Sequence, residues 1–165
     1  MFKKILLVAL LALPFGVFAQ DKIAFVNTQE ILALMPETKA AQVEMEKMGK
    51  QIDSELKTLE DEFAKKYQTF VQQSDTLVES IKIRRTTELN EIRQRMETYR
   101  EEAQQHIYTK QNDLMTPIHQ KLIDTIKTVG EENGYAYIMQ KEAFIFIAET
   151  AIDATPLVKK KLGLQ

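Results

Sequence analysis

The chain has 165 residues, of which 28% are charged and 44% hydrophobic. This composition fits a single domain and excludes a disordered tail or a protein with several membrane spans. The 5 glycines and 4 prolines are too few for an all-β fold with many turns. Because the sequence has no cysteine, disulfides, thiolate nucleophiles and zinc ribbons are also excluded. The composition predicts a mostly helical protein that works through its surface and shape.

Residues 1–19 have the pattern of a secretory signal peptide. Lys3 and Lys4 make the start basic, residues 5–13 are all apolar, and a cleavage site precedes Gln20. The apolar run is shorter than the roughly 20 residues of a membrane span, so we expect cleavage and export rather than a membrane anchor. Loss of the two lysines lowers the net charge by two, from −2 to −4. This acidic balance argues against nucleic acid as a partner.

The mature chain begins with a short apolar segment, residues 22–27, which we expect to form a strand. Asn27 and Thr28 can cap a short helix over residues 29–35. Pro36 cannot continue that helix internally, but it fits the first turn of a new helix that starts near residue 37.

The long segment from residue 37 to Gly130 has two apolar patterns of helical spacing, interrupted only by Gly49 and Pro117. The first pattern has spacings of 3 and 4 that combine into an 11-residue repeat, with about 3.67 residues per turn. It consists of Met45, Met48, Ile52, Leu56, Leu59, Phe63, Tyr67 and Phe70. The second pattern is an ordinary heptad seam. It consists of Leu89, Ile92, Met96, Tyr99 and Ala103.

Each of these apolar stripes is only one residue wide, because the other helix faces carry Glu, Lys, Gln and Arg. A stripe this narrow can join two helices but cannot build a globular core. We therefore predict an antiparallel helical hairpin over 37–115, with arms at 37–76 and 77–115, each about 60 Å long. The tip is expected near 74–80, where the repeat loses phase. A continuous rod that dimerises is the alternative.

After Gly130 the pattern changes from helical to β spacing. Residues 130–134 are typical of a helix stop and a turn. Residues 135–139 and 144–148 are short runs of β type at a hairpin-like distance, and both are apolar on both faces. Thr155 and Pro156 can then start a final short helix.

The predicted fold is α+β and mostly α, with a small β-rich body built from residues 20–36 and 116–165. One chain has too few other apolar residues to cover strands that are apolar on both faces. We therefore expect the body to be an oligomerisation body, closed by copies of the same chain in a cyclic assembly. The residues expected to hold it together are Ile23, Phe25, Val26, Tyr137, Ile138, Phe144, Phe146 and Ile147.

Three segments carry a family resemblance. They are Asp-Lys-Ile-Ala-Phe-Val-Asn at 21–27, Val-Gly-Glu-Glu-Asn-Gly-Tyr-Ala-Tyr-Ile-Met at 129–139 and Asp-Ala-Thr-Pro-Leu-Val-Lys-Lys-Lys-Leu at 153–162. With the charged hairpin between them, they resemble the Skp/OmpH family of periplasmic chaperones over essentially all of the mature chain. The resemblance implies a jellyfish-like homotrimer, in which a β-rich body holds three hairpins around a cavity.

The same resemblance implies a function. Members hold unfolded outer-membrane proteins in the cavity without ATP or another cofactor, after export and before the barrels assemble in the membrane. The best-known members are strongly basic, whereas this chain is acidic overall. An envelope structural or adaptor coiled coil, which would bind a fixed folded partner, is the alternative.

Two features of the hairpin are candidate functional sites. The basic residues Lys82, Arg84 and Arg85 lie near the expected tip, where they are candidates to contact acidic client segments or lipid head groups. The alternative is a solvated helix face with ion pairs along the helix. Pro117 is a candidate hinge of the arm, with a fixed bend as the alternative.

We expect no enzyme activity. His106 and His119 lie among polar residues of helical segments, and the sequence has neither a glycine-rich phosphate loop nor the Asp/Glu-His spacing of metal ligands. The sequence therefore predicts no catalytic, cofactor-binding or metal-binding residues.

Overall fold

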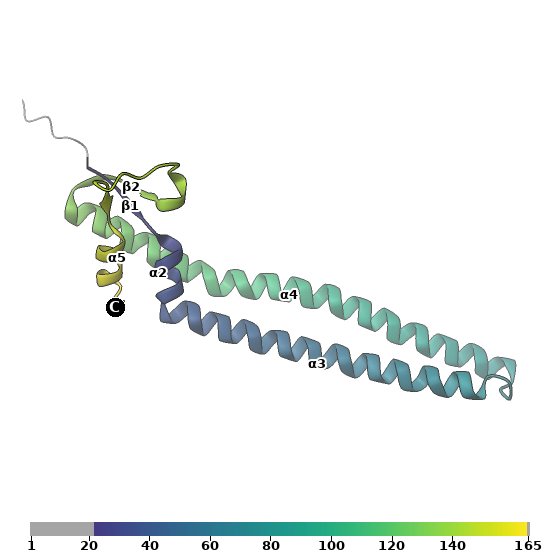
Figure 1. Ribbon diagram of the computed structural model, residues 1–165. Helices are drawn as coiled ribbons and strands as arrows, with labels where there is room; N and C mark the ends of the chain where they lie inside the picture. The colour runs from purple at the N-terminus through teal and green to yellow at the C-terminus, as the bar shows by residue number, and fades with distance from the viewer. Residues whose placement is uncertain (1–21, 165) are drawn as a thin grey trace, which may run out of the picture.

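The computed structural model describes residues 22–164, which form a small body and a long helical hairpin that projects from it (Figure 1). In chain order the elements are strand β1 (Lys22–Val26), helices α2 (Thr28–Leu34), α3 (Pro36–Gln73) and α4 (Glu79–Asn133), strand β2 (Tyr135–Gln140), the 3-10 helix η2 (Lys141–Ala143), strand β3 (Ile152–Asp153) and helix α5 (Thr155–Lys161). The predicted α+β, mostly α fold is confirmed. The predicted signal peptide lies outside the described residues.

Helices α3 and α4 run side by side in opposite directions and form the arm (Figure 1). The 38 residues of α3 span about 57 Å at 1.5 Å per residue. Residues 74–78 form the turn between the two helices, and the N–H groups of Thr76 and Leu77 both donate to the carbonyl of Gln73 there. The chain therefore folds back on itself, and the alternative of one continuous rod is wrong.

The seam between the two helices is better buried on α4 than on α3. Of the predicted heptad residues on α4, all but the half-buried Tyr99 are buried. The predicted repeat on α3 is half-buried except for Tyr67, which is exposed. The ring of Tyr67 instead lies beside the seam and stacks on Phe63, with the ring centroids 5.9 Å apart. The 11-residue repeat therefore describes the α3 seam at every predicted position except Tyr67.

Helix α4 continues from the arm into the body without a break at Pro117. Its C-terminal half packs with β1, α2, the start of α3 and α5 in a single core. The buried residues of this core are Val26, Ile31, Met35, Ala41, Ile118, Leu122, Val129 and Val158. Arm and body thus share one helix, and the division that we placed after residue 115 stays a prediction.

Strand β1 is the central strand of a three-stranded parallel sheet with the order β2-β1-β3. The predicted strand over residues 144–148 is wrong, because the third strand is β3 at Ile152–Asp153. A parallel strand cannot follow its neighbour through a tight hairpin, so the chain must cross the sheet after β2 to reach the other edge of β1. Residues 141–151 make that crossing, and their apolar side chains cover strand β1 rather than pair in the ladder.

A group of hydrogen bonds attaches the C-terminal helix to the N-terminal strand. The N–H of Asn27 donates to Oγ1 of the buried Thr155 over 2.9 Å, and the N–H of Ala154 donates to the carbonyl of Phe25 over 2.8 Å. The Asn27 side chain accepts from the N–H of Glu30 at 3.0 Å and so caps α2. The two ends of the described chain are thereby held together at the base of the arm.

We expect Thr155→Val to lower the free energy of unfolding by about 1–3 kcal/mol, because the partly buried N–H of Asn27 loses its acceptor. Thr155→Ser keeps the hydroxyl group and should cost less. Urea denaturation of the three proteins measures the difference. An equal loss in the two variants would show that the hydrogen bond contributes nothing.

Gly49 inside α3 and Gly134 at the C-terminal end of α4 should respond to alanine in opposite directions. A Cβ at Gly49, inside α3, would meet no atom within 4 Å, so Gly49→Ala should add about 0.5–1 kcal/mol of stability. Gly134 ends α4 at φ +63°, where a side chain costs about 1–2 kcal/mol. Thermal unfolding checks both, and a Gly49→Ala protein that melts below the parent would contradict the first expectation.

Candidate functional site

The outer side of the sheet is an apolar surface that residues 22–164 leave largely uncovered. Along β1, Ala24 and Val26 are buried against the core, whereas Ile23 and Phe25 point to the other side. The register of β1 and β2 pairs Ile23 with Tyr137 and Phe25 with Met139, so these four side chains share the outer side.

The crossing segment lies over part of this outer side. Phe144, Phe146 and Ile147 line a small apolar pocket with Ile23 and Phe25. We call this surface the body face, and its exposed members are Ile23, Tyr137, Met139 and Phe146. The side chain of Phe146 is 80% exposed. A contiguous apolar patch of this kind typically marks an interaction surface.

The predicted oligomerisation residues divide between this body face and the core. Ile23, Phe25, Tyr137, Phe144, Phe146 and Ile147 lie on the body face. Val26 is only 1% exposed, and the half-buried Ile138 packs against the core. Sequence reasoning missed Met139, since assigning it to this face requires knowing that β1 is the central strand and pairs Phe25 with Met139.

Cross-helix pairs line both flanks of the arm. On one flank, Arg95 on α4 pairs with Glu62 on α3 at 3.3 Å. On the opposite flank, Arg100 pairs with Glu60 at 3.0 Å. The guanidinium of Arg93 lies over the ring of Phe63 on that second flank, 5.0 Å from the ring centroid. Exposed pairs of this kind contribute little to stability.

Glu88 gathers three cations near the tip. Arg85 Nη1 and Lys66 Nζ lie 3.2 and 3.5 Å from its Oε2, and Arg84 Nε lies 3.6 Å from its Oε1. Partial desolvation raises the pKa of Glu88, but the hydrogen bonds and charges of Arg85 and Lys66 outweigh it and leave the pKa below its ordinary value. The carboxyl therefore stays ionised and holds the cations together.

The structure brings together two of the three predicted tip residues. Arg84 and Arg85 meet on Glu88, while Lys82 is half-buried and forms no ion pair with a residue of 22–164. Lys66 was missed because it lies on the other helix, 22 residues before Glu88. Pairing the two helices about the turn would have found it.

A second ion pair joins the base of the arm to the body. Lys121 on α4 donates a hydrogen bond to Glu37 in the first turn of α3. This bond, together with a backbone hydrogen bond, lowers the pKa of Glu37. Pro117 lies close by, in a shallow groove that it lines with Ala40 and Leu114, and its role as a hinge stays a prediction.

Residues 22–164 contain no group of three His, Cys, Asp or Glu side chains placed to hold a metal ion. His106 and His119 are both exposed on α4. The helices of the described chain also include none with a stretch long and apolar enough to cross a membrane.

Comparison with known proteins gives consistent similarities. Residues 22–162 match the family described as "Outer membrane protein (OmpH-like)". The chain is 26% identical over 152 residues to "Chaperone protein Skp" of Pectobacterium atrosepticum, which covers 92% of each chain. It is 28% identical over 155 residues to "Chaperone protein Skp" of Photorhabdus laumondii, covering 91% of this chain and 92% of the relative.

The fold is also similar to a solved structure. The crystal structure of an OmpH-like protein from Caulobacter crescentus CB15 superimposes with a TM-score of 0.76 at 14% sequence identity. The superposition covers 87% of this chain and 85% of the other. At that identity the likeness concerns the fold alone.

The lowered pKa values of Glu37 and Glu88 predict a stability that decreases in acid. A carboxyl whose pKa is lower when folded stabilises the protein above its unfolded pKa, about 4.3. That contribution is lost as the pH falls through the folded pKa. We expect the urea midpoint to fall between pH 6 and pH 3, and to fall less in a Glu37→Gln, Glu88→Gln double variant. An unchanged decrease in the double variant would contradict this assignment.

Proposed function

Since the chain belongs to the OmpH-like family of outer membrane proteins, we propose that it is an ATP-independent holdase chaperone of the periplasm. In this proposal the mature chain forms a homotrimer whose arms enclose a cavity. Unfolded outer-membrane proteins are held in the cavity, kept from aggregating, and delivered for assembly in the membrane. The Skp chaperones to which the chain is similar support the general function.

The observation that carries the proposal is the free arm. Within the described chain, α3 and the first half of α4 pack on each other along one seam, and both flanks of this pair are open (Figure 1). Such an arm contributes little to the core of the body. It does provide a long surface of mixed charge with scattered exposed apolar side chains such as Val43, Val71 and Tyr108.

A surface of this kind suits an unfolded membrane barrel as the bound protein. The strands of such a barrel alternate apolar and polar residues, and their unpaired backbone groups make them prone to aggregate. Many weak contacts from several arms add up to useful binding without selecting one sequence. Binding of the unfolded state alone is sufficient to hold it, by mass action and without ATP.

The body face supports self-association. Its exposed apolar residues are not covered by residues 22–164, and β2 and β3 are the two edge strands of the sheet in that part of the chain. A closed symmetric assembly of identical chains would bury this face and would place the arms side by side. The trimer is the assembly that the family resemblance implies.

The arm has two further proposed sites. Lys82, Arg84 and Arg85 at the tip would contact acidic segments of the bound protein, and peripheral contact of the same residues with lipid head groups is the alternative. Pro117, where α3 and α4 meet the body, would let the arm adjust to proteins of different size.

Phe146→Glu should disrupt the assembly, because it places a charge on the apolar body face, where association would desolvate it. Multi-angle light scattering of the mature protein should give the mass of a trimer, and this variant a lower mass. Tyr108→Glu, an equally drastic change on the exposed flank of the arm, is the matched control and should leave the mass unchanged. A monomeric parent protein would overturn the proposed assembly.

The holdase function is tested with several unrelated membrane barrels diluted from urea. We expect the mature protein, without ATP, to suppress the light scattering of each of them. Suppression of none would overturn the proposal. Tight binding to one folded envelope protein, with no suppression, would favour an adaptor coiled coil instead.

A further inference from the structure

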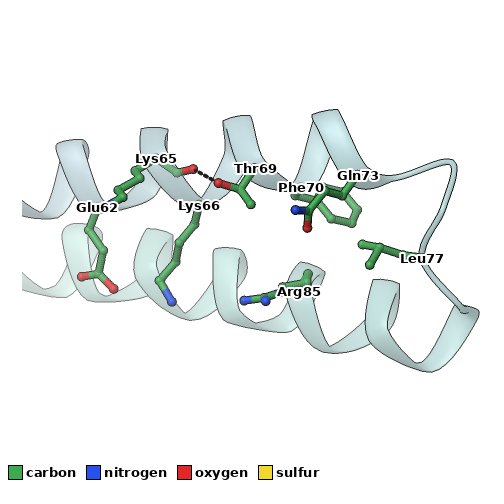
Figure 2. A pocket seen from close by; sticks show the side chains of 8 residues that line it. All are labelled: Glu62, Lys65, Lys66, Thr69, Phe70, Gln73, Leu77 and Arg85. Atoms are coloured by element: carbon green, nitrogen blue, oxygen red, sulfur yellow. Dashed lines mark hydrogen bonds between the residues drawn. The ribbon is translucent and has the colours of Figure 1, made fainter.

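A pocket of about 320 Å³ lies between α3 and α4 beside the turn of the arm (Figure 2). Its residues are Glu62, Lys65, Lys66, Thr69, Phe70, Gln73, Leu77 and Arg85. Phe70 and Leu77 form an apolar end close to the turn, and Lys66 and Arg85 reach toward each other at the other end (Figure 2). The volume is at the lower end of the range for ligand pockets. We call it the tip pocket.

The cationic end of the tip pocket has more positive charge than its own carboxylates neutralise. Lys66 and Arg85 both approach the same Oε2 atom of Glu88, so each keeps N–H donors for another acceptor. Lys65 forms no ion pair with any residue of 22–164. The cations in and next to the pocket are Lys65, Lys66, Arg84, Arg85 and Arg95, against the carboxylates of Glu62 and Glu88.

This arrangement selects a ligand that carries a negative charge and an apolar group a few ångströms apart. In an unfolded polypeptide, an internal Asp or Glu supplies only the charge, and the apolar group has to come from a different residue. The C-terminal residue supplies both whenever its side chain is apolar, and capture of a terminal carboxylate is a recurring mode of peptide recognition.

We propose that the tip pocket binds the C-terminal residue of the protein held by the arms, with its carboxylate at Lys66 and Arg85 and its apolar side chain against Phe70 and Leu77. This inference rests on the proposed holdase function and adds a specific contact to it. An anionic lipid has similar charge, but a membrane presents its head groups as an extended surface. The tip pocket is lined by side chains of both helices and of the turn (Figure 2).

The test compares two peptides that differ only at the C-terminal group. Both have the same unstructured sequence with a terminal leucine and an N-terminal fluorophore, and one ends in a free carboxylate while the other ends in an amide. Fluorescence anisotropy with the mature, assembled protein should show the acid binding at least about fivefold more tightly, because its hydrogen bonds are charge-assisted. The difference should shrink in high salt.

Variants then assign the difference to the pocket. Lys66→Gln and Arg85→Gln should each reduce the preference for the acid while leaving the binding of the amide peptide unchanged, and Lys66→Arg should retain the preference. Lys57→Gln removes a charge from an exposed position of α3 outside the pocket and should change neither peptide. Circular dichroism checks that each variant keeps its helices.

Equal affinity for the two peptides on the parent protein would overturn the inference without any variant. So would a preference that survives Lys66→Gln combined with Arg85→Gln. Binding to phosphatidylglycerol vesicles that depends on these two residues, with no preference between the peptides, would show a lipid site instead. The same preparation is also tested for suppression of barrel aggregation. If it suppresses aggregation but shows no preference for the acid peptide, the tip-pocket inference is wrong while the proposed holdase function is not.

Discussion

Helix α4 is the element on which the rest of the structure depends, because it belongs to both the arm and the body. Its N-terminal half buries Leu89, Ile92 and Met96 against α3, and its C-terminal half buries Leu122 and Val129 in the core of the body. Since the helix is continuous, packing in the body also sets the direction of the arm. The ion pair between Glu37 and Lys121 lies where the part of α4 that belongs to the arm meets the part that belongs to the body.

How far the sequence predicts this fold depends on how many structures each pattern allows. The heptad of α4 allows little besides a helix seam, and the loss of repeat near Ser74 is followed in the structure by the turn at 74–78. The run at 144–148 is short and apolar on both faces, a pattern that fits a buried strand and a covering segment equally well. The choice between them depends on the position of β1 at the centre of the sheet, which involves contacts far apart in sequence. The pairing of Lys66 with Glu88 was missed for the same reason.

The apolar and charged surfaces of the chain are separated in space. The body face concentrates large exposed side chains such as Phe146 at the base, while the arm carries charges of both signs with exposed apolar residues among them. A single apolar patch favours assembly into one closed oligomer, because the patch is buried when that oligomer forms. Dispersed apolar residues among charges favour weak and repeated contact with an extended polypeptide. One chain thus separates the surface suited to stable assembly from the surface suited to transient binding.

The tip pocket follows from an interruption of the seam. Extending the heptad of α4 from Ile92 and Leu89 toward the turn places Arg85 and Lys82 at the next two seam positions, and both are half-buried. A leucine at position 85 would fill the space between the helices, as Leu89 does one turn later. The charged end of Arg85 instead turns toward Glu88, and Phe70 and Leu77 are left lining an open pocket. Local departures of this kind from the packing pattern cost stability and are expected at functional sites. The interruption that ends the coiled coil therefore also places cations beside exposed apolar surface.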